Sequence, residues 1–291
     1  MQQQDPGSVL VISSHVIRGA VGNRAAVFAL ETLGHTVWAL PTIILPWHPG
    51  HGPSVRIALE AGDFASAAAD LARSPHTGEL KAALTGYFAS ADQVRAARDL
   101  LVELKSRNPD LVYLCDPVIG DKSGLYVSVE IAEAIGECLL PLADIATPNR
   151  FELAWFAKAE LDNNQAIAAA ALALGPKSVL VTSAIAMMAK STGNLWVTGH
   201  EIVLAEHRLV DNPPNGLGDL LAALFLSRLV RGENAEKALQ SATSSVFEIL
   251  VRSVKRNADE LNLPGEASSL ATPMAMVQMR KLMHPGRGRN A

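Results

Sequence analysis

The residues best suited to chemistry lie in a short glycine-rich stretch, residues 215–219 (Asn-Gly-Leu-Gly-Asp), which runs directly into the apolar segment 220–230. Gly216 and Gly218 allow the backbone to turn tightly and to approach a ligand closely, and the apolar segment is typical of a buried helix. The free N–H groups at such a helix start attract anions such as phosphate. A carboxylate there, Asp219, can accept a proton from a hydroxyl group that attacks the phosphorus. Asp219 also fits a purely structural role as a helix N-cap, so this stretch alone leaves both interpretations open.

A second group of oxygen-bearing side chains follows two other apolar segments, with Asp116 after one and Asn149 and Glu152 after the next. A few oxygen ligands of this kind suit a Mg²⁺ ion that is held mainly by phosphate. Asn149 and Glu152 are three residues apart, so they share one face of a helical first turn. Residues 147–152 also fit an ordinary helix start, with a proline at the first position and a glutamate in the first turn.

Other candidates carry weaker signals. Thr182 and Ser183 end an apolar segment; their hydroxyls suit a phosphate or a ribose, although small polar residues often end strands. His48 and His51 flank a Pro-Gly pair in a loop and suit an aromatic ligand, although a solvated loop histidine is more common. The histidines lack zinc spacing. The chain also lacks the glycine–lysine phosphate loop and the glycine spacing of dinucleotide-binding folds.

The elements that must position these residues alternate along the chain. Strands are predicted over residues 9–13, 36–40 (ended by Pro41), 82–84, 110–115, 144–146 and 178–182. Helices are predicted over residues 25–33, 56–73, 91–106, 127–139, 150–159, 163–174 and 235–255, and a hairpin is predicted with its turn at residues 191–194. This alternation predicts an α/β fold with a mostly parallel central sheet and helices on both faces.

In such a sheet, ligands bind beyond the carboxyl ends of the strands. The polar residues that follow the predicted strands all fall at that edge, whereas a random scatter would place as many at the opposite edge. This clustering favours a functional site, and its members are Ser14, His48, Tyr87, Asp116, Asn149, Thr182 and Asp219.

Composition excludes several classes of protein. The chain has 291 residues, of which 49% are hydrophobic and 19% are charged, as expected for a soluble globular protein. A net charge of −4 without a basic stripe argues against a nucleic-acid partner. The sequence shows neither a membrane span nor a signal peptide. Cys115 and Cys138 lie in apolar segments and suggest reduced thiols, so a cytoplasmic location without a membrane partner is expected.

Six segments, taken together, resemble the pyridoxal kinases of the ribokinase-like superfamily. They occur in the family's order, the match extends over about residues 9–250, and the serine–histidine pair at Ser14 separates them from the sugar kinases. The resemblance implies one three-layer α/β/α kinase domain over residues 1–283. The basic stretch after it, residues 284–291, is expected to be a disordered tail. The segments are residues 14–19 with 22–26, 47–52, 84–87, 115–121, 147–153 and 216–219.

The resemblance implies ATP-dependent phosphorylation of the 5′-hydroxyl of pyridoxal in vitamin B6 salvage. Asp219 corresponds to the base, and the backbone N–H groups of Gly216, Leu217 and Gly218 to the hole that holds the γ-phosphate. Asp116 and Glu152, with Asn149 in support, correspond to the Mg²⁺–phosphate group. The nucleotide contacts implied are Thr147, Thr182, Ser183, His207, Arg208, Leu209 and Val210, and those to the vitamer are Ser14, His48, Pro49 and Tyr87.

The resemblance also implies a homodimer and leaves a need for a monovalent cation open. Three residues depart from the family pattern. Leu217 stands where a smaller Thr or Val is usual, but the hole uses backbone N–H groups and is expected to survive. Pro49 replaces a threonine and His51 a tyrosine, both on the vitamer side. A hydroxymethylpyrimidine kinase and a non-catalytic B6-binding protein are the alternative functions.

Overall fold

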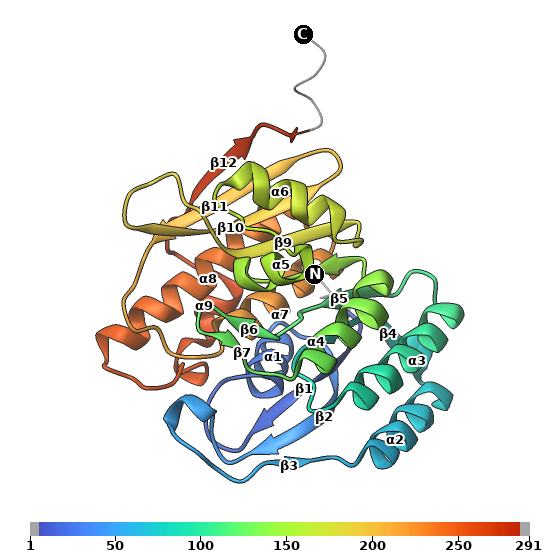
Figure 1. Cartoon of the computed structure of the whole chain (residues 1–291). Helices are drawn as coiled ribbons and strands as arrows, with labels where there is room; N and C mark the ends of the chain where they lie inside the picture. The colour runs from blue at the N-terminus through green and yellow to red at the C-terminus, as the bar shows by residue number, and fades with distance from the viewer. Residues whose placement is uncertain (1–5, 286–291) are drawn as a thin grey trace, which may run out of the picture.

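A ten-stranded sheet runs through the computed structural model, which describes residues 6–285 (Figure 1). The six strands β2, β1, β4, β5, β8 and β9 pair in parallel in that order, and β3, β10, β11 and β12 add antiparallel edges. The strands are β1 (Ser8–Val16), β2 (Thr36–Leu45), β3 (Ile57–Ala58), β4 (Leu80–Thr85), β5 (Val112–Cys115), β8 (Ile145–Ala146), β9 (Ser178–Ala184), β10 (Ser191–Thr198), β11 (Ile202–Arg208) and β12 (Gln278–Leu282), with a separate small hairpin of β6 (Gly120–Asp121) and β7 (Gly124–Leu125).

Helices cover both faces of the sheet, as the alternation predicted. Side chains of β1 point alternately to the two sides, so Val9 and Val11 join one buried cluster and Leu10 and Ile12 the other. On the first face lie α1 (Asn23–Thr32), α7 (Leu217–Val230), α8 (Ala235–Lys255) and α9 (Ala267–Ala271). On the second lie α2 (Ala61–Arg73), α3 (Ala91–Arg107), α4 (Val129–Ala134), α5 (Arg150–Ala157) and α6 (Asn164–Ala173). Short turns of helix are η1 (Pro49–His51), η2 (Thr77–Glu79), η3 (Ile135–Leu139), η4 (Leu140–Leu142) and η5 (Pro264–Glu266).

Several predicted elements were wrong in extent: β1 runs on to Val16, and the helix predicted over residues 127–139 is α4 followed by η3. Three further cases alter the strands. β2 does not stop at Pro41 but runs to Leu45, because the sheet accommodates the missing N–H where the β1–β2 register shifts, after Ser13. Residues 57–58 form β3, and the helix begins only at Ala61. The predicted turn at residues 191–194 is part of β10, and the connection to β9 is residues 185–190. The polar Asn194 is tolerated inside the strand because its side chain donates to the Thr243 hydroxyl at 3.1 Å.

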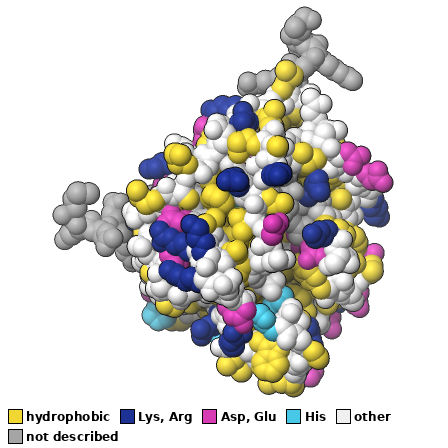
Figure 2. All heavy atoms as spheres, turned by 90° about the vertical axis from the view of Figure 1, so that its left-hand side faces the viewer, with side chains coloured by type: hydrophobic (Ala, Val, Ile, Leu, Met, Phe, Trp, Pro, Cys, Tyr) yellow, Lys and Arg dark blue, Asp and Glu magenta, His cyan; other side chains and the backbone are white. Residues whose placement is uncertain are grey.

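The architecture brings the strand ends and one helix start together. The parallel strands finish at the same edge of the sheet, and α7 begins there. On the face drawn in Figure 2, Lys and Arg side chains lie among Asp and Glu side chains. Across residues 6–285, no helix is long and apolar enough to cross a bilayer. Most of the predicted tail, residues 286–291, lies outside the described residues.

Candidate active site

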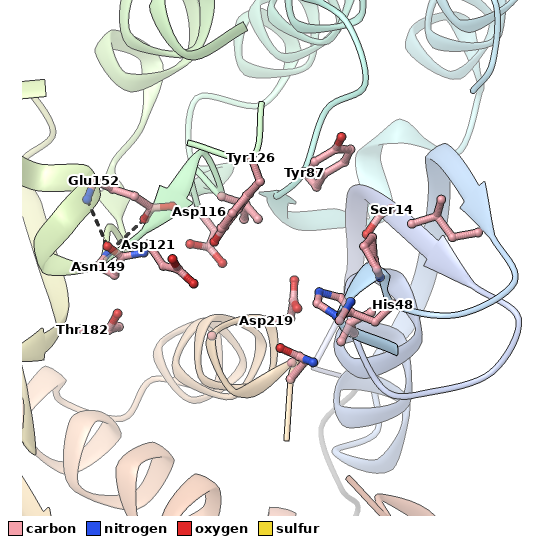
Figure 3. Close-up of a pocket in the computed structure, with 18 of the residues that line it drawn as sticks. Ser14, His48, Tyr87, Asp116, Asp121, Tyr126, Asn149, Glu152, Thr182 and Asp219 are labelled. Atoms are coloured by element: carbon pink, nitrogen blue, oxygen red, sulfur yellow. Dashed lines mark hydrogen bonds between the residues drawn. The ribbon is translucent and has the colours of Figure 1, made fainter. Parts of the chain in front are cut away.

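A cavity of about 660 Å³ opens at this edge of the sheet, and it contains most of the predicted site (Figure 3). The predicted residues that line it are Ser14, His48, Pro49, Tyr87, Asp116, Thr147, Asn149, Glu152, Thr182, Gly216, Gly218 and Asp219. The predicted residues that do not line it are Ser183, His207, Arg208, Leu209, Val210 and Leu217. In Figure 3, Asp219 lies between Ser14 and His48 on one side and Asn149, Glu152 and Thr182 on the other.

The glycine turn forms an uncapped helix start. The N-cap of α7 is Gly216, with φ 91°, and no side chain caps the helix. A Cβ atom at Gly216 would lie 2.0 Å from the carbonyl oxygen of Ala20, so both the conformation and the space require glycine. The interpretation of Asp219 as the N-cap is therefore wrong. The first N–H groups of α7 have no capping side chain and face a cavity that contains a carboxylate.

Asp219 lies in the first turn of α7 and is partly exposed to the cavity. Burial raises its pKa above the usual range, and hydrogen bonding from the backbone N–H of Gly22 opposes that rise. A raised pKa makes an ionised carboxylate a stronger proton acceptor. Asp219 therefore has the position and the basicity of a general base for a hydroxyl held beside it.

Asn149 and Glu152 form a capping box at the start of α5. The Asn149 Oδ1 atom accepts the Glu152 N–H at 3.0 Å, and the Glu152 Oε2 atom accepts the Asn149 N–H at 2.8 Å. Glu152 Oε1 also accepts the N–H groups of Ile119 at 2.8 Å and Gly120 at 3.4 Å. The predicted helix start with Glu152 in the first turn is confirmed, but Pro148 precedes the N-cap and is not the first helical residue. The same contacts bind the chain after β5 to the start of α5 at the cavity wall.

Carboxyl groups gather at this end of the cavity. Burial raises the pKa of Glu152 to about 7. Burial, and then repulsion from Glu152 and Asp219, raises the pKa of Asp116 well above its usual range. Carboxylates that oppose each other's ionisation form a suitable environment for a divalent cation. Within residues 6–285 no three acidic, His or Cys side chains are arranged to cage an ion, so Mg²⁺ fits here only with phosphate and water as further ligands.

The other end of the cavity is built from loops. The imidazole of His48 accepts the Gly50 N–H at 3.0 Å, and desolvation lowers its pKa, which favours the neutral ring. Arg56 donates to the Tyr87 hydroxyl at 2.6 Å, with its guanidinium 6.0 Å from the ring centre. Of the residues described as lining the cavity, Arg56 is the only lysine or arginine. This end therefore offers an aromatic ring and hydrogen-bond donors, whereas the opposite end offers carboxylates.

Sequence reasoning missed several lining residues. The β6–β7 hairpin carries Asp121, and Ser123 and Tyr126 lie in or beside it; the Ser123 N–H donates to Asp121 at 2.7 Å. Asp121 belongs to residues 115–121, one of the segments that resemble the family, so its carboxylate could have been predicted to line the site. No pattern in the neighbouring sequence indicates Tyr126. Arg56 was hidden by the prediction of a helix over residues 56–73.

The segment predicted to contact the nucleotide, residues 207–210 (the flap), includes the end of β11 and does not line the cavity. The His207 ring stacks on Phe247 with centres 4.4 Å apart, and the Leu209 N–H donates to the Lys190 carbonyl at 2.9 Å. Leu209 is 58% exposed, and Ser183 has a φ of 55° at the end of β9. An exposed apolar side chain beside two partly buried rings suits contact with a flat ligand.

Comparison with known proteins gives consistent matches over most of the chain. Residues 70–263 match a family model described as phosphomethylpyrimidine kinase. A pyridoxal kinase PdxY from Rubrobacter xylanophilus is 34% identical over 97% of this chain and 100% of its own length, and one from Corynebacterium diphtheriae is 32% identical over 94% and 99%. The solved structure of pyridoxal kinase from Leishmania donovani in complex with ADP and pyridoxamine has a TM-score of 0.89 and 26% identity, covering 95% of this chain and 100% of that one. The solved structure of pyridoxal kinase from Entamoeba histolytica has a TM-score of 0.86 and 26% sequence identity, covering 95% of this chain and 99% of that one.

Proposed function

The chain belongs to the pyridoxal kinase family, and from that membership we propose that it transfers the γ-phosphoryl group of ATP to the 5′-hydroxyl of pyridoxal. The fold is the ribokinase-like three-layer arrangement of the solved pyridoxal kinases that it matches. The reaction places the enzyme in vitamin B6 salvage, with pyridoxine and pyridoxamine as further acceptors.

One observation carries the assignment of roles: the uncapped start of α7 and the Asp219 carboxylate lie in one cavity, between a carboxylate end and an aromatic end. In the proposed reaction, the N–H groups of Gly216, Leu217 and Gly218 hold the transferred phosphoryl group as its charge develops. Asp219 accepts the hydroxyl proton. Catalysis by positioning and charge stabilisation is what phosphoryl transfer requires.

Mg²⁺, when bound, would neutralise the phosphate charge at the carboxylate end. Asp116 would be its direct protein ligand, because each oxygen of Glu152 already accepts at least one backbone N–H. Glu152 would act through water and through the loop that it fixes. The ordering of Glu152 by backbone N–H groups supports this division of roles.

The nucleotide would extend from the phosphate site toward β9 and β11. Thr147, Thr182 and Ser183 would contact its phosphates and ribose, and the flap His207, Arg208, Leu209 and Val210 would cover the base. The same proposal includes a single domain over residues 1–283, a homodimer and a cytoplasmic location. The free thiols of Cys115 and Cys138 support a reducing compartment.

A second candidate acceptor is a hydroxymethylpyrimidine, because the matching family model is described as phosphomethylpyrimidine kinase, which names a related pyrimidine. ADP release separates the candidates when pyridoxal, pyridoxine, pyridoxamine and hydroxymethylpyrimidine are supplied one at a time, with and without Mg²⁺. We expect Mg²⁺-dependent ADP release with the B6 vitamers. A greater kcat/KM for the pyrimidine would reassign the substrate, and tight pyridoxal binding without ADP release would indicate a non-catalytic vitamin-binding protein.

A further inference from the structure

Glu260 has no role in the proposed chemistry, yet it touches two loops at the vitamer end of the cavity. It lies in the segment between α8 and η5, and only 12% of its side chain is exposed. Its Oε1 atom lies 2.8 Å from Nε2 of His51, and its Oε2 atom accepts the Ala20 N–H at 3.3 Å. One carboxylate therefore links residues about 210 and 240 positions earlier in the chain.

Both partners belong to loops that border the cavity. The His51 loop, residues 47–52, places His48, Pro49 and Gly50 in the cavity wall. The Ala20 turn, residues 19–21, contributes Val21. These lining residues are close neighbours of the two groups that Glu260 holds, so a displacement of Glu260 would reach the wall directly.

Both loops also pack closely against the start of the glycine turn. A Cβ atom at Gly216 would lie 2.0 Å from the Ala20 carbonyl oxygen, and one at Gly50 would lie 3.0 Å from Nδ2 of Asn215. Close packing of this kind transmits small shifts, because there is no free space to absorb them. The loops that Glu260 contacts therefore pack against the glycine turn, next to the place where the vitamer hydroxyl would meet the phosphoryl group.

The His51 loop has few other attachments. Its remaining hydrogen bonds in the described structure join loop residues to each other: Trp47 Nε1 to the Gly52 carbonyl at 3.2 Å, Gly50 N–H to His48, and the backbone bonds of η1. The segment that carries Glu260 is by contrast well anchored, since Leu261 and Leu263 beside it are buried in the core. A fixed carboxylate thus holds a weakly attached loop.

We propose that Glu260 is a positioning residue, which fixes the His51 loop and the Ala20 turn in the arrangement that receives the vitamer. The inference rests on the proposed function for its substrate. Without this contact, the loop would have to be ordered on binding, and that cost would appear as weaker affinity for the vitamer. The nucleotide end, held by backbone contacts of its own, would be unaffected.

The test compares three single variants. Glu260→Ala removes both contacts, and we expect the KM for pyridoxal to rise about fivefold to tenfold, with kcat and the KM for ATP within about twofold of the parent. Glu260→Gln retains an oxygen that can accept from Ala20 and an amide that can donate to His51, so it should recover most of the affinity. Asp259→Asn is the matched control. It removes the adjacent carboxylate, which pairs at 2.6 Å with the exposed Arg18, and should leave every constant unchanged.

A double-mutant cycle with His51→Ala tests the path of the effect. We expect Glu260→Ala to add less than about twofold to the KM of His51→Ala, because contacting residues are not additive. A pyridoxal KM within twofold of the parent in Glu260→Ala would overturn the proposal, as would an equal rise in the KM for ATP or an equal effect of Asp259→Asn.

Amide hydrogen exchange of residues 47–52 gives a readout that needs no substrate. We expect faster exchange there in Glu260→Ala than in the parent or in Asp259→Asn, and unchanged exchange would contradict the proposal. If the parent enzyme turned over no vitamer, the proposed function would fail, whereas this measurement would still decide whether Glu260 fixes the loop.

Discussion

The two ends of the cavity are held in place by different means. At the carboxylate end, Glu152 accepts N–H groups from residues 119, 120 and 149, and it is itself part of a capping box. At the vitamer end, side chains join loops, as in the pair of the exposed Arg56 with the partly buried Tyr87. Backbone contacts at a helix start leave little freedom, whereas side-chain pairs between loops can be exchanged one residue at a time. The comparison suggests that phosphoryl chemistry is built into the fold, while recognition of the acceptor is adjustable.

The largest effect is expected at Asp219, between the two ends. Asp219→Asn keeps the volume of the side chain but removes the proton acceptor, so kcat should fall by about 10²–10⁴-fold. Both KM values should change little if Asp219 belongs to the chemistry rather than to either binding end. Steady-state kinetics together with ATP binding by calorimetry measure this. Turnover within tenfold of the parent would remove Asp219 from the role of base.

The carboxylate end should also make stability depend on pH in an unusual direction. A folded pKa of about 7 for Glu152, against 4.5 ordinarily, means that the folded state binds more protons than the unfolded state between these values. The free energy of unfolding should therefore fall as pH rises from about 4.5 to 7, by up to roughly 3 kcal/mol from this group. Asp116 should act in the same direction, since its pKa is raised too.

Urea unfolding between pH 4.5 and 8, without nucleotide, measures that slope. Glu152→Gln removes the titrating group and should flatten the slope, and Mg²⁺ with a nucleotide should restore stability at pH 7 in the parent, because the bound cation favours the ionised carboxylates. Carboxylates with lowered pKa values, such as Asp144, lose their contribution only at lower pH and do not interfere. If the free energy of unfolding depended on pH equally in the parent and in Glu152→Gln, burial would not raise the pKa of Glu152 in the folded protein.

A smaller effect is expected at the vitamer end. Arg56→Gln removes the cation that donates to Tyr87 but retains some hydrogen-bonding capacity, and the KM for pyridoxal should rise about threefold to fivefold. The KM for ATP should not change, because the partner of Arg56 lies on the vitamer side. The KM of Arg56→Lys for pyridoxal should lie between those of the parent and of Arg56→Gln, since lysine keeps the positive charge but lacks the planar guanidinium. A matching rise in the KM for ATP would contradict the separation of the two ends.

The same contrast explains what could be predicted from the sequence. Asn149, Glu152 and Gly216 act through local backbone geometry at helix starts, and local geometry leaves a pattern in the sequence. Arg56 and Glu260 act through partners 31 and 209 residues away, which no local pattern reveals. The parallel sheet followed from the alternation of strands and helices. The edge strand β12 did not, because its residues are partly exposed and it is defined by pairing with β11.

The smallest predicted effect compares two helix caps of the same chemistry. The Oδ1 atom of Asn149 accepts the Glu152 N–H at 3.0 Å, and that of Asn163 accepts the Ala166 N–H at 2.9 Å. Either asparagine changed to alanine should cost about 1 kcal/mol of stability, because one N–H at the helix start loses its acceptor. Only Asn149 also donates to the Gly120 carbonyl, at 2.8 Å, beside the carboxylate end.

Asn149→Ala should therefore raise the KM for Mg²⁺–ATP about twofold to fivefold, whereas Asn163→Ala should leave it unchanged. Thermal unfolding of both variants provides the control, since it shows whether the loss of stability is matched. If two equally destabilised variants differ in nucleotide affinity, the capping box at α5 serves the site as well as the fold. If they do not differ, the carboxylate end tolerates the loss of the hydrogen bond from Asn149 to the Gly120 carbonyl. The two ends of the cavity would then differ only in how exposed their side chains are.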